Sequence, residues 1–137
     1  MQRLVAAAAF AILALASPAL AIEMCGSGPR VNCIVDGDTF WLDGVKYRSN
    51  GYDTPEVSAQ HACGGREELA LGARASRRLL ELFSTTTITL EPTGGMSYDR
   101  VLVVVRSNGE NVADILVREG LAAYYPDGCE FWCGSCN

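Results

Sequence analysis

The chain has 137 residues, with 11 basic and 16 acidic side chains and a formal net charge of −5. A chain of this length provides one small domain, whose core is only just large enough to fold without covalent help. The acidic balance excludes proteins whose whole surface attracts nucleic acid, because nonspecific affinity for phosphates depends on excess positive charge. Any chemistry on nucleic acid must therefore rest on a local positive site that includes a bound cation.

The first 21 residues have the layout of a secretory signal peptide. Arg3 supplies the positive charge, an apolar run follows it, and small residues end the segment at Ala21. The alternative is an uncleaved membrane anchor, since the apolar stretch is about long enough to cross a bilayer. The alanine-rich run and Pro18 favour cleavage after Ala21. Residues 22–137 then form one domain, which we expect in the periplasm or outside the cell without stable membrane association.

Six cysteines follow this segment: Cys25, Cys33, Cys63, Cys129, Cys133 and Cys136. An even number in an exported domain predicts disulfide bonds, although the sequence does not choose between the possible pairings. The alternative is a zinc site made by the last three cysteines, because Cys133-Gly-Ser-Cys136 has the close spacing of a ligand pair. Its fourth ligand would have to be remote, so we favour three disulfides.

Short runs of β-branched and aromatic residues predict strands over residues 30–36, 39–42 and 45–48, and the Asp43-Gly44 pair predicts a hairpin between the last two. Residues 67–83 then change to a helical period. Gly72 is expected to weaken this helix by about 1 kcal/mol relative to alanine. The helical face consists of Leu69, Ala73, Ser76, Leu79, Leu80 and Phe83.

Two more strands are predicted over residues 86–90 and 101–106, followed by a helix that begins at an Asn111 cap and ends at Gly120. Its buried residues are expected to be Val112, Ile115 and Leu116. Five strands with a helix after the third predict a small OB-type Greek-key barrel, a β-barrel with two helices in the α+β class. The tail from Pro126 to Asn137 is interpreted as a disulfide-rich strap without a helix.

Two segments carry the candidate chemistry. Asp36-Gly37-Asp38 places two carboxylates around a glycine at a strand junction, a pattern that alone is more typical of a turn. Asp53-Thr54-Pro55-Glu56 is more informative, because Pro55 stiffens the corner and biases Thr54 toward an extended shape. Such a corner can aim the Asp53 carboxylate and the Thr54 carbonyl at one point. Hard oxygen ligands of this kind suit calcium or magnesium.

These pieces, in this order and spacing, resemble the staphylococcal nuclease-like family. The resemblance runs from about Val31 to Tyr125 and includes the second predicted helix. The family keeps functional residues at the positions of Asp38, Arg48, Asp53, Thr54, Glu56 and Arg100.

The resemblance implies a calcium-dependent nuclease that acts on DNA or RNA and leaves 3′-phosphorylated products. Asp38, Asp53 and the Thr54 carbonyl would hold Ca²⁺, and Glu56 would orient or deprotonate the attacking water. Two arginines, Arg48 and Arg100, would bind the phosphate and offset its growing charge. Tyr98 would lie near the bound phosphate, although a tyrosine in such a segment is most often simple packing. We expect a monomer.

Two nearby residues receive separate interpretations. Asp99 replaces a glycine of the family pattern and is expected to pair with Arg100, in competition with the substrate. His61 has no second histidine beside it, so a surface position is favoured over metal binding.

Two other classes of protein are compatible with parts of the sequence. A catalytically silent OB module could bind nucleic acid, oligosaccharide or protein on the same barrel face. An exported structural domain would explain the cysteines and the charge but not the placement of Asp38 and Asp53. The complete set of Glu56, Arg48 and Arg100 favours the enzyme, because pure binding has no reason to assemble it.

Overall fold

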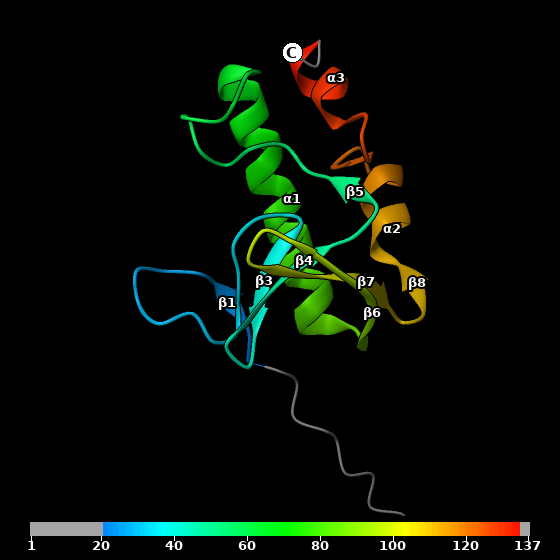
Figure 1. Ribbon diagram of the computed structural model, residues 1–137. Helices are drawn as coiled ribbons and strands as arrows, with labels where there is room; N and C mark the ends of the chain where they lie inside the picture. The colour runs from blue at the N-terminus through cyan, green and yellow to red at the C-terminus, as the bar shows by residue number, and fades with distance from the viewer. Residues whose placement is uncertain (1–20, 135–137) are drawn as a thin grey trace, which may run out of the picture.

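The computed structural model describes residues 21–134, apart from the side chain of Cys129. Figure 1 shows a long helix beside a set of strands, with the C-terminal segment packed near one end of that helix. The strands are β1 (Glu23–Met24), β2 (Cys33–Ile34), β3 (Thr39–Leu42), β4 (Val45–Ser49), β5 (Tyr52–Asp53), β6 (Ile88–Ser97), β7 (Arg100–Ser107), β8 (Glu110–Asn111) and β9 (Ala123–Tyr124). The helices are α1 (Gly65–Thr85), α2 (Val112–Arg118) and α3 (Gly128–Cys133).

The five predicted strands correspond to β2, β3, β4, β6 and β7. Four further strands of two residues each, β1, β5, β8 and β9, raise the number above the prediction. The strands of the main sheet lie in the order β1-β2-β3-β4-β7-β6, with β8 on β7, while β5 pairs only with β9. No pairing within residues 21–134 joins β1 to β6. Closure of this sheet into a barrel therefore stays a prediction.

The hairpin between β3 and β4 forms as predicted. Asp43 and Gly44 have φ angles of 49° and 77°, and positive φ at both central residues is typical of a tight hairpin turn. This turn fixes the register so that Thr39 lies opposite Arg48. β4 then pairs in parallel with β7, with Arg48 opposite Leu102. The hairpin thus brings Arg48 beside the strand junction that carries Asp38.

Helix α1 covers the core of the sheet. Phe40 of β3 is fully buried, and its ring lies 4.9 Å from that of Phe83 on α1, measured between centroids. Leu79 and Ala75 are also fully buried in the same cluster, together with Val103 of β7. Burial of apolar surface between the helix and the sheet is the main source of stability here.

The helical face is rotated from the prediction. Ser76, Leu79 and Phe83 are buried as expected, but Leu69, Ala73 and Leu80 are only partly buried. Glu68 and Gly72 lie on the buried face instead. The prediction places only apolar residues on the buried face. Near the start of α1, however, Glu68 is buried because it accepts hydrogen bonds from backbone N–H groups, and Gly72 is buried because the backbone of another segment lies against it.

Helix α2 agrees with its prediction. The Asn111 side chain accepts a hydrogen bond from the Ala113 N–H at 3.0 Å, as an N-cap residue does. The helix ends before Gly120, whose φ of 70° suits a chain that leaves a helix. Its predicted apolar residues, Val112, Ile115 and Leu116, are all buried.

The interpretation of the tail as a strap without a helix is wrong. Residues Gly128–Cys133 form α3, whose end is accommodated by Gly134 in the left-handed conformation. Six residues are too few for a helix to be stable alone, so tertiary contacts must stabilise it. The start of α3 packs closely against Asp53. A Cβ atom at Gly128 would lie only 2.9 Å from Cβ of Asp53, so the glycine allows this contact.

Two disulfides are present among residues 21–134, Cys25–Cys33 and Cys63–Cys133. Because Cys133 is bonded to Cys63, its sulfur is not a thiolate ligand, and the zinc alternative loses one of its three cysteines. The third predicted disulfide stays a prediction, since Cys136 and the Cys129 side chain lie outside the described part of the chain. The predicted signal peptide also lies outside it, except for Ala21. Among residues 21–134, no helix is long and apolar enough to cross a membrane.

The two disulfides are expected to differ in their contribution to stability. Their cysteines are separated by 70 and by 8 residues. Loop-closure entropy assigns about 4 kcal/mol to the longer loop and about 2.5 kcal/mol to the shorter. Urea unfolding of Cys63→Ser/Cys133→Ser should therefore show the larger loss in free energy of unfolding, with Cys25→Ser/Cys33→Ser as the matched control. A larger loss in the control would contradict this ranking.

Candidate active site

A polar pocket of about 300 Å³ opens where the β2–β3 junction, the corner after β5 and the C-terminal helix meet. Six of the residues predicted for the site line it: Asp38, Arg48, Asp53, Thr54, Glu56 and Arg100. Five carboxylates and two guanidinium groups share the pocket wall, the additional carboxylates being those of Asp36 and Glu68. The balance of charge in the pocket therefore favours a cation.

Asp38 is held in place by a tight turn. The Asp36 carboxylate accepts hydrogen bonds from the N–H groups of Asp38 and Thr39 at 3.1 and 2.8 Å, a pattern that fixes the turn. Gly37 is required within it, because a Cβ atom there would lie 2.9 Å from Cβ of Ala75. The Asp38 side chain is thereby buried and turned into the pocket, where its Oδ2 accepts from the Thr54 N–H at 3.3 Å.

Arg48 joins the two carboxylates. Its Nη1 donates to Oδ1 of Asp38 at 3.0 Å, and its Nη2 donates to Oδ1 of Asp53. Burial acts to lower the pKa of Arg48, but the two carboxylates outweigh it and hold the pKa above its ordinary value. Burial, followed by the neighbouring Asp36, raises the pKa of Asp38, and Arg48 opposes this shift. Asp38 and Asp53 thus converge on one cationic group.

The corner after β5 carries the next group. Asp53 pairs with Ala123 in the small sheet, and the hydroxyl of Tyr52 donates to the Gly37 carbonyl at 2.9 Å. Tyr52 therefore ties this corner to the turn that carries Asp38, a contact that the sequence analysis missed. The only sequence feature that points to this contact is the position of a tyrosine directly before the acidic motif.

Glu56 follows the corner with its side chain exposed. Glu56 is exposed overall, but neighbouring protein atoms shield its carboxyl from part of the solvent, and this desolvation, followed by repulsion from Asp36, raises its pKa. A carboxylate with a raised pKa binds a proton more readily, which suits a general base. His61 lies in the loop after Glu56, exposed as predicted, and it lines the same pocket.

Arg100 enters from the start of β7 with no carboxylate bonded to it among residues 21–134. Its guanidinium donates to the Thr39 hydroxyl at 3.3 Å and to the Ser97 hydroxyl at 3.0 Å. The expected pairing with Asp99 is wrong, because Asp99 forms an ion pair with Lys46 at 3.0 Å. The bond from Lys46 lowers the pKa of Asp99. Arg100 therefore remains available to bind an anion.

Tyr98 lies outside the pocket, in a neighbouring groove of about 880 Å³ that Arg48, Glu56 and Arg100 also line. Tyr98 is 92% exposed, and the Arg100 guanidinium lies 6.0 Å from the centre of its ring. Tyr125, also exposed, lines the same groove. Exposed aromatic rings beside a guanidinium that no carboxylate neutralises among residues 21–134 are suited to stacking on bases next to a phosphate.

The model of the family described as "Staphylococcal nuclease homologue" matches residues 46–130, more than half of the chain. The chain belongs to this family. A search of curated proteins gave no match.

Membership of the staphylococcal nuclease homologue family implies an OB-like barrel and a nuclease-type or nucleic-acid-binding function. The matched segment contains Arg48, Asp53, Thr54, Glu56 and Arg100. Asp38 precedes the match, and it is the hydrogen bonds to Arg48 and to the Thr54 backbone that bring it into the same pocket.

Proposed function

We propose that this protein is an exported, calcium-dependent nuclease that hydrolyses phosphodiester bonds of DNA or RNA. The observation that carries the proposal is the convergence of Asp38, Asp53, Glu56 and two arginines on one pocket. A binding module needs positive charge and aromatic surface, but it has no need of two carboxylates that converge, one of them buried, beside a third carboxylate with a raised pKa.

The donor set fits calcium. Asp38 and Asp53 already face a common cation, the Arg48 guanidinium, so their oxygens converge. With the Thr54 carbonyl, they would offer the hard oxygen ligands that Ca²⁺ prefers. Bound Ca²⁺ would supply Lewis-acid stabilisation and orientation of the phosphate.

In the proposed reaction, Glu56 accepts a proton from water as the water oxygen bonds to phosphorus. The bond from phosphorus to the 5′-oxygen breaks, and that oxygen takes a proton from solvent, which leaves a 3′-phosphate. Arg100 and Arg48 offset the negative charge that builds on the phosphate oxygens. The planar guanidinium of Arg100, which is bonded to no carboxylate among residues 21–134, can donate two parallel hydrogen bonds to a phosphate.

Export is part of the proposal. The two disulfides are consistent with an extracellular or periplasmic location, since such bonds persist in oxidising compartments. The layout of the first 21 residues supports the same route. We propose that the signal peptide is cleaved after Ala21 and that the exported protein is a monomer.

A nucleic-acid-binding module without catalysis is the second candidate, favoured by the exposed Tyr98 and Tyr125 in the groove beside Arg100. Arg100→Lys separates the two functions, because lysine keeps the charge but loses the planar fork. For an enzyme, we expect the cleavage rate to fall by about tenfold or more while affinity for an oligonucleotide changes little.

Arg106→Lys is the matched control, since Arg106 lies on the same strand and pairs with Glu91 outside both pockets. Cleavage and binding are measured on one labelled oligonucleotide. Binding without cleavage by the unmodified protein, with Ca²⁺ present, would favour the second candidate instead.

A further inference from the structure

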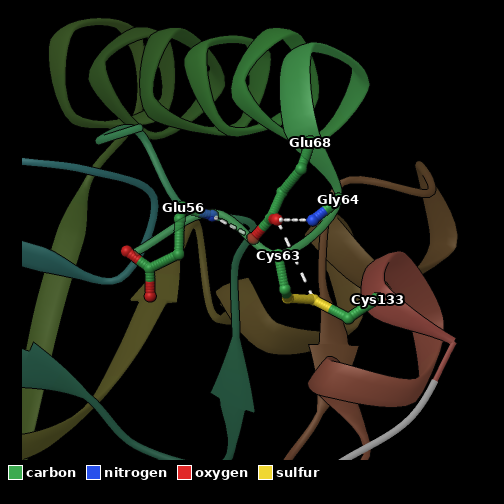
Figure 2. The surroundings of a disulfide bond; sticks show 5 residues. All are labelled: Glu56, Cys63, Gly64, Glu68 and Cys133. Carbon is green, nitrogen blue, oxygen red and sulfur yellow. Dashed lines mark hydrogen bonds between the residues drawn. A yellow bond between two sulfur atoms is a disulfide. The ribbon is translucent and has the colours of Figure 1, made fainter. Parts of the chain in front are cut away.

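Glu68 lies in the first turn of α1, and only 2% of its surface is exposed. A buried carboxylate is costly unless it is hydrogen-bonded. Its Oε1 accepts from the Glu56 N–H at 3.0 Å, and its Oε2 accepts from the Gly64 N–H at 2.6 Å (Figure 2). These donors lie at the two ends of the loop of residues 56–64. One carboxylate therefore closes this loop and ties it to α1.

Part of this arrangement is ordinary helix capping. Gly64 is the N-cap residue of α1, and an acidic side chain in the first turn that bonds back to the N-cap N–H stabilises a helix start. Capping accounts for the bond to Gly64 alone. The bond to Glu56 reaches outside the helix and acts on the residue that enters the pocket.

A second contact holds the same peptide from its other side. Gly72 lies one turn after Glu68, on the same face of α1. A Cβ atom at Gly72 would lie 2.6 Å from the carbonyl oxygens of both Pro55 and Glu56, so only glycine permits this approach. Helix α1 thus contacts Glu56 at its N–H through Glu68 and at its carbonyl through Gly72.

The Cys63–Cys133 disulfide also packs against the Glu68 carboxylate. Sγ of Cys133 lies 3.8 Å from Oε2 of Glu68 (Figure 2). A disulfide sulfur carries no hydrogen, so this is a packing contact. The backbone of α3 also lies close to the Gly64 donor. A Cβ atom at Gly64 would overlap the Trp132 carbonyl oxygen, so this position, like Gly72, requires glycine. The two hydrogen bonds and the contact with the disulfide together restrict the position of the Glu68 carboxylate.

We propose that Glu68 is a positioning residue for Glu56. By holding the Glu56 N–H, it fixes the direction from which the Glu56 carboxylate enters the pocket. The inference rests on the proposed function, since it takes Glu56 as the base. It assigns Glu68 no contact with the substrate.

Glu68→Gln tests this, because glutamine keeps the size but presents an NH₂ group to one of the two N–H donors. We expect amide hydrogen exchange at Glu56 and Gly64 to accelerate by about tenfold or more. We expect kcat per folded molecule to fall about tenfold to 100-fold with KM nearly unchanged, since small displacements of a catalytic group cost rate. Glu67→Gln, on the exposed face of the same turn, is the matched control and should behave as the unmodified protein.

Protected amides at both positions together with an unchanged kcat in Glu68→Gln would overturn the proposal. If Glu68→Gln fails to fold, amide hydrogen exchange in the unmodified protein tests the proposal instead. The amides of Glu56 and Gly64 must then exchange more slowly than that of Ala59, which is exposed in the same loop, and equal rates overturn the proposal. If the unmodified protein cleaves no phosphodiester, the nuclease proposal fails, whereas slow exchange that Glu68→Gln abolishes still supports the hold on Glu56.

Discussion

Replacing Glu56 with glutamine is expected to lower the rate of phosphodiester cleavage by about 100-fold or more. Glutamine keeps the shape of the side chain but cannot accept a proton from the attacking water. Stability should barely change, because the Glu56 side chain is exposed and makes no side-chain hydrogen bond in the described part of the chain. Initial rates and thermal unfolding of the two proteins are the measurements.

The affinity of Glu56→Gln for an uncleaved oligonucleotide serves as the control. It should match that of the unmodified protein, since the arginines and the aromatic groove are intact. Full activity in Glu56→Gln would remove the proposed base. A fall in affinity equal to the fall in rate would assign Glu56 to binding instead.

Removing Ca²⁺ is expected to have the largest effect. The metal contributes several kcal/mol of charge stabilisation in such reactions, so excess chelator should lower cleavage by about 1,000-fold or more. Mg²⁺ is expected to restore less activity than Ca²⁺, because it requires stricter octahedral geometry. Undiminished cleavage in chelator would show that the metal has no part in the reaction.

Calcium affinity should also depend on pH in a definite direction. Burial raises the pKa of Asp38, so this carboxyl retains a proton to a higher pH than an exposed aspartate does. Ca²⁺ must displace that proton to bind. The dissociation constant for Ca²⁺, measured by titration calorimetry, should therefore increase as the pH falls. An affinity that increases with falling pH would contradict this sign.

Some parts of the site could be predicted because they are local in sequence. Pro55 restricts the corner from Asp53 to Glu56, and the Asp43-Gly44 turn fixes the hairpin that brings Arg48 to Asp38. Local constraints of this kind operate before any tertiary packing is known.

Glu68 could not be predicted in the same way. A glutamate in the first turn of a helix is usually a solvated residue that stabilises the helix start. Its burial depends on the close approach of Gly72 to the Glu56 carbonyl, which is a tertiary contact. Helix propensity predicts only a local weakness at Gly72, whereas in the structure this glycine permits the close approach of α1 to the Glu56 carbonyl.

Asp99 is a case in which neighbours in the sequence do not form the ion pair. It precedes Arg100 directly, but it pairs with Lys46. Asp99 lies in the turn between β6 and β7, where Tyr98 has a φ of 56°, whereas Arg100 is the first residue of β7. The Asp99 side chain meets Lys46 on β4, because β4 is the neighbour of β7 in the sheet. The ion pair between Asp99 and Lys46 therefore depends on the pairing of β4 with β7, which are far apart in the sequence.

Analysis of reaction products tests the nuclease account most directly. Residues 22–137 with intact disulfides are incubated with Ca²⁺ and 5′-labelled single-stranded DNA, double-stranded DNA or RNA, and the product ends are identified by their response to a phosphatase. We expect shortened products with 3′-phosphate ends from at least one substrate, and their near absence with Glu56→Gln. Intact oligonucleotide in every reaction, or the same products at the same rate from Glu56→Gln, would contradict it.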